Sequence, residues 1–429
     1  MLDALIRALR LPDLRNKVLF TFAMLVVFRI FAHIPVPGVN PAQLAQLLQT
    51  NQLMGMLNLF SGGALTTFSI AAMGVYPYIT AQIVMQLLVG TIPALEELSR
   101  EGESGRQKIN QYINWLTVPL AFLQAYGTGV LLQSKGILTS FGFTGASALP
   151  TLAIVVSMTA GTIFLVWLGE LITENGIGNG VSIIIFVGIV SRLPQMVGQS
   201  LAEAATGTGS IFTPLVFAGL GVLTVAAIVV VQEAQRRLPV QYAKRIRGNR
   251  MYGGQSTHIP LRVNSAGMIP LIFAMSIMLL PGTVASYLAV APGTVGNVAA
   301  FIRDLFNATG PVYWLCYFFL VVMFTFFYTM VIFQQQKLAE NLQKYGGFIP
   351  GIRPGRPTEE YLNKVLFRIT ILGALFLGVV AILPFFAQGI STNLILSSTG
   401  LLIVVGVVLD TMKQLEAQLM MRNYEGFIK

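Results

Sequence analysis

Long uncharged hydrophobic runs recur along the whole chain, and shorter polar segments separate them. A helix needs about 20 mostly apolar residues to cross a hydrocarbon core about 30 Å thick. Backbone polar groups in lipid must be hydrogen-bonded within their own segment, so each such run is predicted to be a helix. The runs that qualify are 18–36, 74–92, 112–133, 149–169, 180–198, 212–231, 265–289, 312–333, 369–387 and 394–412. The pattern therefore predicts an all-α polytopic membrane protein with ten transmembrane helices.

Composition and charge agree with this prediction and add an orientation. Of the 429 residues, 55% are hydrophobic and 10% are charged, whereas a soluble domain carries about 25% charged residues. If the N-terminus is cytoplasmic, 23 of the 27 Lys and Arg residues fall in cytoplasmic segments. Because positive charge gathers on the cytoplasmic side of membrane proteins, both termini are expected there.

The ten spans divide into two halves of five, residues 1–211 and 212–429. An odd number of spans in each half makes the halves point in opposite directions through the membrane. That arrangement is what an inverted repeat requires.

An uncharged segment, residues 54–71, connects the first two spans and is interrupted by Gly62 and Gly63. Two alternatives remain open for it. It forms an amphipathic loop at the outer surface, or it forms a short helix folded back into the membrane. The second is tolerated only where the segment is buried in protein or lines a cavity.

Two cytoplasmic loops, 232–263 and 334–368, are longer than a connection between spans requires, and long loops tend to be functional. Residues 236–262 contain seven basic residues and no acidic one. The stretch 346–357 is too rich in Pro and Gly for a regular helix. Such basic loops determine topology, and their size also indicates an anionic partner, either nucleic acid or acidic lipid.

Chemistry-bearing patterns are absent from the sequence. It has no HExxH, CxxC or Walker motif, and no two acidic residues share a span. A catalytic site, a metal site and a cofactor are therefore not expected, and an enzyme is disfavoured. Arg29 lies inside the first span, where we expect it to pair with carbonyls or polar groups of a neighbouring helix. The alternative is direct contact between Arg29 and transported material.

Several segments, in order along the chain, resemble the SecY/Sec translocon family. They include FRIFAHIPVPGV (28–39), LNLFSGGAL (57–65), GVYPYITAQIVMQLL (74–88), WLGELITENGIGNGVSIIIF (167–186), GGFIPGIRPG (346–355) and LLIVV (401–405). The resemblance implies two inverted halves of five helices around an hourglass pore, closed by a short re-entrant plug helix at 54–71. It also implies a protein-conducting channel, which passes unfolded polypeptides across the membrane and releases hydrophobic segments sideways into it.

Pore and plug positions follow from the same resemblance. The implied pore ring is Val75, Ile79, Val181, Ile185, Ile272 and Ile403. The implied plug residues are Leu57, Asn58, Phe60, Ser61, Gly62, Gly63 and Leu65. A ring of aliphatic side chains makes a constriction that gates by dewetting.

Gate and docking positions are implied as well. The lateral gate, where the second span faces the seventh and eighth, includes Thr80, Gln86, Asn264 and Leu280, with Thr80 opposite Leu280 across the closed seam. The docking residues for a motor or ribosome are Arg236, Arg237, Lys244, Arg245, Arg247, Arg250, Arg353 and Arg356.

The partners that the resemblance implies are the SecE and SecG subunits, the SecA motor, ribosomal RNA, signal sequences, nascent polypeptides and anionic lipids. The expected location is the bacterial inner membrane. An ion-coupled secondary transporter with inverted repeats is the alternative, and it would need acidic or His residues near the membrane midplane. A receptor or scaffold role for the basic face is a third hypothesis.

Overall fold

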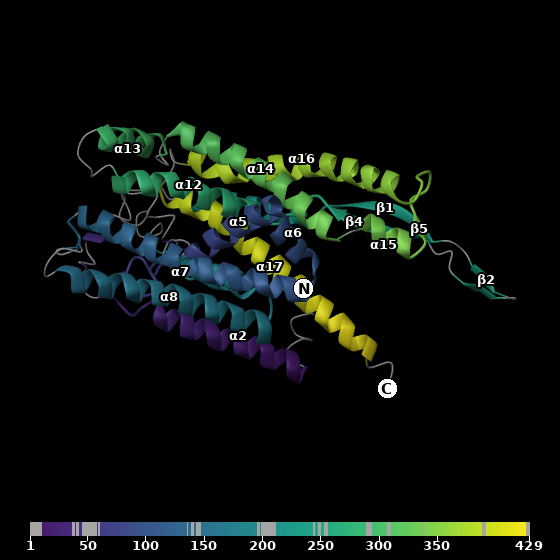
Figure 1. Cartoon of the computed structure of the whole chain (residues 1–429), viewed down its shortest axis with the longest axis horizontal. Helices are drawn as coiled ribbons and strands as arrows, with labels where there is room; N and C mark the ends of the chain where they lie inside the picture. The colour runs from purple at the N-terminus through teal and green to yellow at the C-terminus, as the bar shows by residue number, and fades with distance from the viewer. Residues whose placement is uncertain are drawn as a thin grey trace.

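The computed structural model shows a bundle of long helices with a small sheet at one end (Figure 1). It describes residues 11–36, 39, 43–44, 58, 61–134, 136–138, 141–142, 147–194, 198, 212–242, 245–247, 250–252, 256–288, 294–306, 310–336, 338–387 and 392–425. The end of the bundle that carries the sheet is called the sheet end below, and the opposite end is called the far end.

The helices follow the predicted hydrophobic runs. Those of the first half are α2 (Pro12–Phe31), α5 (Tyr76–Thr91), α6 (Pro93–Arg100), α7 (Glu103–Ser134), α8 (Ala148–Asn175) and α9 (Gly180–Val190). Those of the second half are α11 (Phe212–Glu233), α12 (Ile269–Leu288), α13 (Thr294–Leu305), α14 (Pro311–Gln336), α15 (Leu338–Lys344), α16 (Arg356–Ala387) and α17 (Thr392–Glu425). Each predicted range overlaps one of these helices.

Helix ends differ from the predicted ends in both directions. α7, α16 and α17 extend beyond the apolar runs into polar sequence, whereas α9 is an 11-residue helix within the longer predicted range 180–198. Hydropathy reports which part of a helix is apolar, and a helix continues wherever its backbone hydrogen bonds are satisfied.

Four described helices are long and apolar enough to cross a membrane: α7, α8, α14 and α16. α5 and α6 meet the same criterion together, although they are bent by 101° at Ile92. This bend follows from Pro93, which disfavours the helical conformation for the residue before it. The chain is thus mostly helical with several apolar helices, and the ten-span count stays a prediction.

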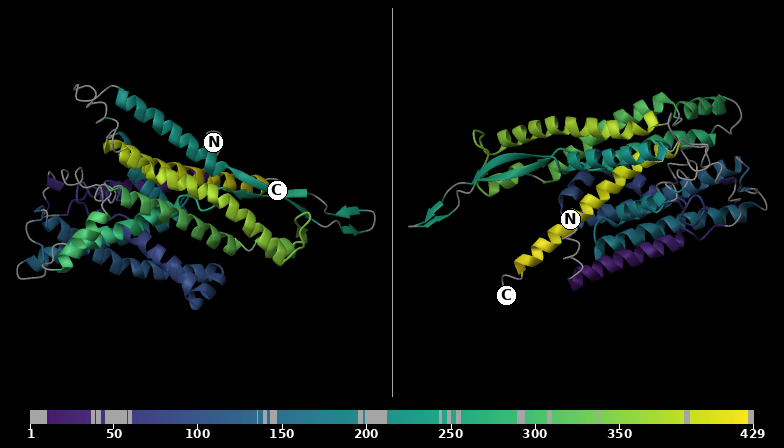
Figure 2. Two further views of the ribbon diagram at one scale, coloured as in Figure 1. Left: turned by 90° about the horizontal axis from the view of Figure 1, so that it is seen from above. Right: turned by 180° about the vertical axis from the view of Figure 1, so that it is seen from behind.

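A small sheet corrects the all-α prediction. Its central strand β1 (Gln235–Tyr242) pairs antiparallel with β4 (Ser256–Arg262) and with β5 (Gly347–Phe348). Two further strands, β2 (Arg245–Arg247) and β3 (Arg250–Tyr252), form a hairpin that stands clear of the helices (Figure 2). In β1, Leu238 and Val240 are buried while their neighbours are exposed. This alternation is too short to stand out among the basic residues of the loop.

The predicted loop 334–368 is also more ordered than expected. The end of α14, the short helix α15 and the first turns of α16 occupy most of it. The Pro- and Gly-rich stretch contains no helix before Arg356, as predicted.

The hydrophobic core lies between the two halves of the chain. Its largest cluster draws side chains from α5, α8 and α9 of the first half and from α12, α14, α16 and α17 of the second. A separate cluster packs the sheet against α14, α15 and α16. The halves therefore meet through a shared apolar interior, and the sheet is anchored to the second half.

Candidate functional site

The described part of the plug segment (residues 54–71) is mostly buried, although Thr67 is exposed. Over 61–71 it consists of turns in place of the expected helix, while Leu57 and Phe60 lie outside the described residues. Asn58, Ser61 and Leu65 are each at most 2% exposed. This burial favours the fold-back alternative over a loop at the outer surface.

Backbone hydrogen bonds attach the later part of the plug segment to the chain that follows α2. Val36 N–H donates to Phe68 O at 2.9 Å, and Ile70 N–H donates to Ile34 O at 3.0 Å. The hydroxyl of Thr67 donates to Ala32 O at 3.1 Å. These bonds form a short two-stranded stretch at the base of the segment.

Two glycines bring the plug segment directly against α9. A Cβ on Gly188 would lie 2.5 Å from the Cα of Gly62, and a Cβ on Gly62 would lie 2.8 Å from the Cα of Gly188. Gly62 also has a φ of +67°, which disfavours other residues. The two main chains thus touch with no side chain between them.

Two arginines contact the plug segment close to these glycines. Arg29 of α2 donates from Nη1 to Gly62 O at 3.3 Å. Arg192 donates to the side-chain oxygen of Asn58, from Nη1 at 3.1 Å and from Nη2 at 3.2 Å, when the Asn58 amide is oriented with its oxygen toward Arg192. The prediction that Arg29 pairs with a carbonyl is confirmed, although the partner belongs to the plug segment and not to a neighbouring helix.

Arg192 was missed as a site residue. The sequence offered one indication of its role: Arg192 lies near the outer end of a predicted span, where an unpaired charge is costly. An Arg at such a depth needs acceptors, and an uncharged segment rich in Gly supplies backbone carbonyls.

The six predicted pore-ring residues all belong to the large apolar cluster between the two halves of the chain. Five of them belong to its buried part and are at most 7% exposed, and Val181 packs against it half-buried. They come from the start of α5 and from α9, α12 and α17. These helices belong to both halves of the chain, so the cluster lies where the halves meet.

A hydrogen bond links α5 and α12 across the seam between them. The Tyr76 hydroxyl donates to Ser276 O at 3.1 Å. The two helices run in opposite directions, since α5 leads toward the sheet end and α12 starts from it (Figure 1). Residues after Tyr76 in α5 therefore lie beside residues before Ser276 in α12.

The predicted pairing of Thr80 with Leu280 stays a prediction, because the Leu280 side chain is outside what the structure describes. The Thr80 hydroxyl donates to Tyr76 O of its own helix at 3.1 Å. Sequence reasoning missed Tyr76 and Ser276, because an aromatic and a serine within apolar runs are ordinary core residues.

Two other predicted gate residues carry side-chain amides. Asn264 donates from Nδ2 to Gly267 O at 2.9 Å, so it supports the turn before α12. Gln86 of α5 lies beside Tyr328 of α14. The side-chain oxygens of Asn264 and Gln86 have no partner among the described residues.

The sheet joins the two basic loops into one surface. β1 carries the exposed Arg236 and Arg237, and it pairs with β5 immediately before the turn that exposes Arg353. The hydroxyl of Thr358 donates to Arg353 O at 2.8 Å and fixes this turn. Of the other predicted docking residues, Arg245 and Arg247 lie on β2, Arg250 lies on β3, Arg356 is ion-paired with Glu360 at 3.3 Å, and Lys244 lies outside the described residues.

A polar cavity of 460 Å³ opens between α9, α11, α12 and α17 on the side of the sheet. Asn179, Gln232 and Asp410 line it, together with Arg262 at the end of β4. Lys413, which also lines it, is ion-paired with Glu233 of α11 at 2.6 Å.

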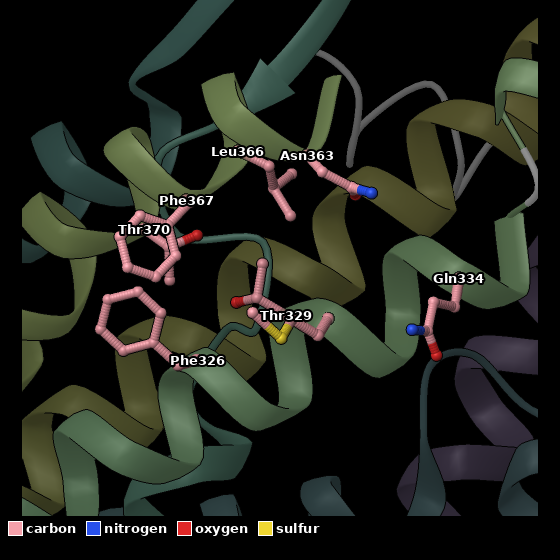
Figure 3. A pocket seen from close by; sticks show the side chains of 8 residues that line it. Phe326, Thr329, Gln334, Asn363, Leu366, Phe367 and Thr370 are labelled. Atoms are coloured by element: carbon pink, nitrogen blue, oxygen red, sulfur yellow. The ribbon is translucent and has the colours of Figure 1, made fainter. Parts of the chain in front are cut away.

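A smaller pocket of 190 Å³ lies between α14 and α16 (Figure 3). Phe326 and Phe367 stand at one end of it, with ring centroids 5.1 Å apart, and the amides of Gln334 and Asn363 stand at the other. It is separate from the pore-ring cluster and shares no residue with it.

No group of three or more His, Cys, Asp or Glu side chains in the described part of the chain is placed to hold an ion. Cys316 is a half-buried free thiol.

A family model described as SecY matches residues 69–412. The chain belongs to the SecY family. The protein translocase subunit SecY of Streptomyces galbus is 47% identical over 444 residues that cover 100% of both chains. The SecY of Halalkalibacterium halodurans is also 47% identical, over 98% of each chain.

Solved structures of SecY-family channels share the fold. A SecY structure whose plug domain stabilises the closed state and maintains a membrane seal has a TM-score of 0.64, with 18% identity over 94% of this chain and 92% of that one. Sec61 in a canine ribosome–channel complex has a TM-score of 0.59 and 18% identity over the same shares. The predicted resemblance is therefore confirmed, and the family is that of a protein-conducting channel.

Proposed function

We propose that this SecY-family chain is the channel subunit of a Sec translocon in a bacterial inner membrane. It passes unfolded polypeptides across the membrane and releases hydrophobic segments sideways into the lipid. One observation carries this proposal: the order of features along α9. Asn179 at its start lines the polar cavity, Val181 and Ile185 join the pore-ring cluster, and Gly188 touches the plug segment.

These features succeed one another over a short distance. Nine residues of helix separate Asn179 from Gly188, which is about 14 Å of axial rise. A polar funnel, an apolar constriction and a plug thus follow in sequence along one axis. This is the arrangement that a gated pore for a chain of mixed polarity requires, because an apolar constriction excludes water and ions without binding the chain that passes.

The sideways exit is assigned to the seam between α5 and α12. A hydrogen bond contributes about 0.5–1.5 kcal/mol net, so the one between Tyr76 and Ser276 closes the seam weakly. The incompletely bonded amides of Gln86 and Asn264 lie near the same seam. A polar segment of a translocating polypeptide would supply hydrogen-bond donors to these oxygens. Opening of the seam is therefore favoured when a polypeptide occupies the channel.

The basic surface formed by β1 and the turn at Arg353 is proposed as the docking site for a SecA motor or a ribosome. Its exposed arginines suit phosphate, since a guanidinium can bind a phosphate through two parallel hydrogen bonds. The likeness to a ribosome-bound Sec61 channel supports this choice. SecE, SecG and anionic lipids are proposed as further partners.

The membrane arrangement that goes with this function has ten spans in two inverted halves, 1–211 and 212–429, with both termini in the cytoplasm. The sheet end is then cytoplasmic. This orientation puts the polar cavity on the side from which a nascent chain enters.

An ion-coupled secondary transporter remains the alternative. It would need ionisable groups free to bind a coupling ion near the midplane. Arg29 and Arg192, which lie within predicted spans, are instead hydrogen-bonded to the plug segment.

The test is reconstitution of the chain with SecE and SecG in vesicles, followed by SecA, ATP and a secretory precursor. We expect the precursor to become protected from added protease in an ATP-dependent way. If the vesicles protect no precursor but take up a small solute along an ion gradient, the transporter hypothesis would replace the channel hypothesis.

A further inference from the structure

α13 carries an exposed apolar stripe at the far end of the molecule. Val298, Phe301 and Leu305 are 59%, 68% and 40% exposed. Their spacing of three and four residues puts them on one face of the helix. Arg303 lies on the opposite side of the helix and pairs with its neighbour Asp304 at 2.9 Å.

An apolar groove of 440 Å³ runs between this helix and the end of α12. Its volume lies within the usual range of about 300–1,000 Å³ for ligand sites. The residues that line it are Pro281, Val284, Ala285, Leu288, Thr294, Val298, Ala299 and Ile302. Val298 therefore belongs to both the groove and the stripe, so the two form one continuous apolar surface.

The surroundings of the groove are those of a lipid-facing surface. Val284 and Leu288 are about half exposed on α12, and Val312 and Leu315 are similarly exposed on the neighbouring α14. α13 lies at the far end, opposite the basic sheet (Figure 1). Because its two charges neutralise each other, an anionic or cationic partner has little to recognise there.

A soluble surface rarely exposes three large apolar side chains in a row beside an open apolar groove. A helix with one apolar and one polar face instead lies in the plane of a membrane interface, with its apolar face in the acyl boundary. We propose that α13 lies in the outer leaflet and that an acyl chain of an outer-leaflet phospholipid occupies the groove between α13 and α12.

This site would connect the lipid to a gate helix. α12 carries Ser276 of the α5–α12 seam on the same helix whose end forms the groove. Lipid packing in the outer leaflet would therefore act on the position of α12. The groove requires nothing beyond the folded chain in a bilayer, whereas its place in the outer leaflet rests on the proposed orientation.

The first experiment measures the depth of α13. After Cys316→Ser, a fluorescent thiol probe is placed at Phe301→Cys, or at Arg303→Cys as a matched position on the opposite side of the same helix. Both side chains are exposed, so both positions can be labelled. In vesicles that contain phospholipid with a doxyl group high on the acyl chain, we expect several-fold stronger quenching at position 301 than at position 303.

The second experiment tests the groove itself. Ala299→Leu fills the groove from its buried side, whereas Ala300→Leu adds the same volume on a part of α13 that does not line it. We expect native mass spectrometry of the purified protein to show one fewer retained phospholipid for Ala299→Leu and no change for Ala300→Leu. Equal quenching at the two labelled positions, or equal lipid retention by the two leucine variants, would overturn the proposal. Shielding of position 301 from lipid would point to a protein partner on the stripe instead.

Discussion

At Gly62 and Gly188 the main chain of the plug segment meets the main chain of α9 with no side chain between them. Contacts of this kind tolerate no added atom, because close-packed interiors respond to a change of a single methyl group. The hydrogen bond from Arg29 to Gly62 O acts at the same residue. Single residues therefore determine how closely the plug segment packs against α9.

Gly188→Ala should displace the plug segment from α9. The new Cβ would lie 2.5 Å from the Cα of Gly62, and overpacking of this kind costs about 1–3 kcal/mol. We expect a higher ion conductance of the idle channel in planar bilayers, with near-normal protein levels. Gly90→Ala is the matched control, because a Cβ there meets nothing within 4 Å. If both variants conduct like the parent, the glycine contact does not hold the closed state.

Arg353→Glu should strongly reduce SecA-driven export while leaving protein level and SecE association near normal. The residue is exposed in a turn that a hydrogen bond from Thr358 fixes, so its charge faces a docking partner and supports no core contact. Export is measured as protease-protected precursor in vesicles. Arg356→Glu is an informative comparison, because Arg356 already pairs with Glu360 and is expected to matter less. Unimpaired export by Arg353→Glu would remove this arginine from the docking surface.

At the scale of elements, α5 and α12 share mostly apolar side chains, and the Tyr76 hydroxyl donates to Ser276 O across the seam. In lipid, two apolar helix faces gain little from covering each other, because the lipid tails are equally apolar. Packing and polar contacts therefore decide how strongly the two helices associate.

Tyr76→Phe should lower the free energy of opening. Loss of one hydrogen bond costs about 0.5–1.5 kcal/mol, so we expect better export of precursors with weakened signal sequences. Tyr78→Phe is the control, since Tyr78 lies two residues along α5 and packs on the cluster that faces α7. Equal export by the two variants would mean that the seam bond does not limit opening.

The converse experiment locks the same seam. After Cys316→Ser, Tyr76→Cys and Ser276→Cys are joined by a short bis-thiol reagent that a reductant cleaves. We expect the linked channel to export no precursor and to recover on reduction. Efficient linking with full export would place the exit elsewhere.

Particular elements show how far sequence could predict this structure. The spans were predictable because lipid forces apolar runs to be helical, and the aliphatic ring followed from resemblance to the SecY family. The sheet was not, since its buried positions Leu238 and Val240 are two among many basic and polar neighbours. The Gly62–Gly188 contact and the partners of Arg29 and Arg192 depend on which segments meet in space, which hydropathy along one chain does not report.

At the scale of the whole molecule, the pore-ring residues come from both halves, with α5 and α9 from one and α12 and α17 from the other. In the proposed channel, a relative movement of the halves therefore changes the constriction directly. The sheet is attached to the second half, so a partner bound there can pull on one half alone.

Replacing Ile79, Ile185, Ile272 and Ile403 together with Ser should wet the constriction and let small ions through the idle channel. Deletion of 57–67 should add to this leak and relax the demand for a strong signal sequence. The matched control replaces the same four residues with Val, which keeps the ring apolar at about 0.5–1.5 kcal/mol per site. Planar-bilayer conductance equal to the parent in both the Ser and the deletion variants would exclude the cluster as the seal.

The short two-stranded stretch made by Val36 with Phe68 and by Ile34 with Ile70 gives the plug segment a permanent tether. When residues 58–63 leave α9, they remain attached through a few residues to a fixed base. Resealing is then an intramolecular step, whose effective concentration for a short tether is about millimolar. The closing rate should not depend on how many channels a membrane holds. A free peptide of residues 57–67, added to a channel that lacks them, would need to approach about millimolar concentration to seal it equally well.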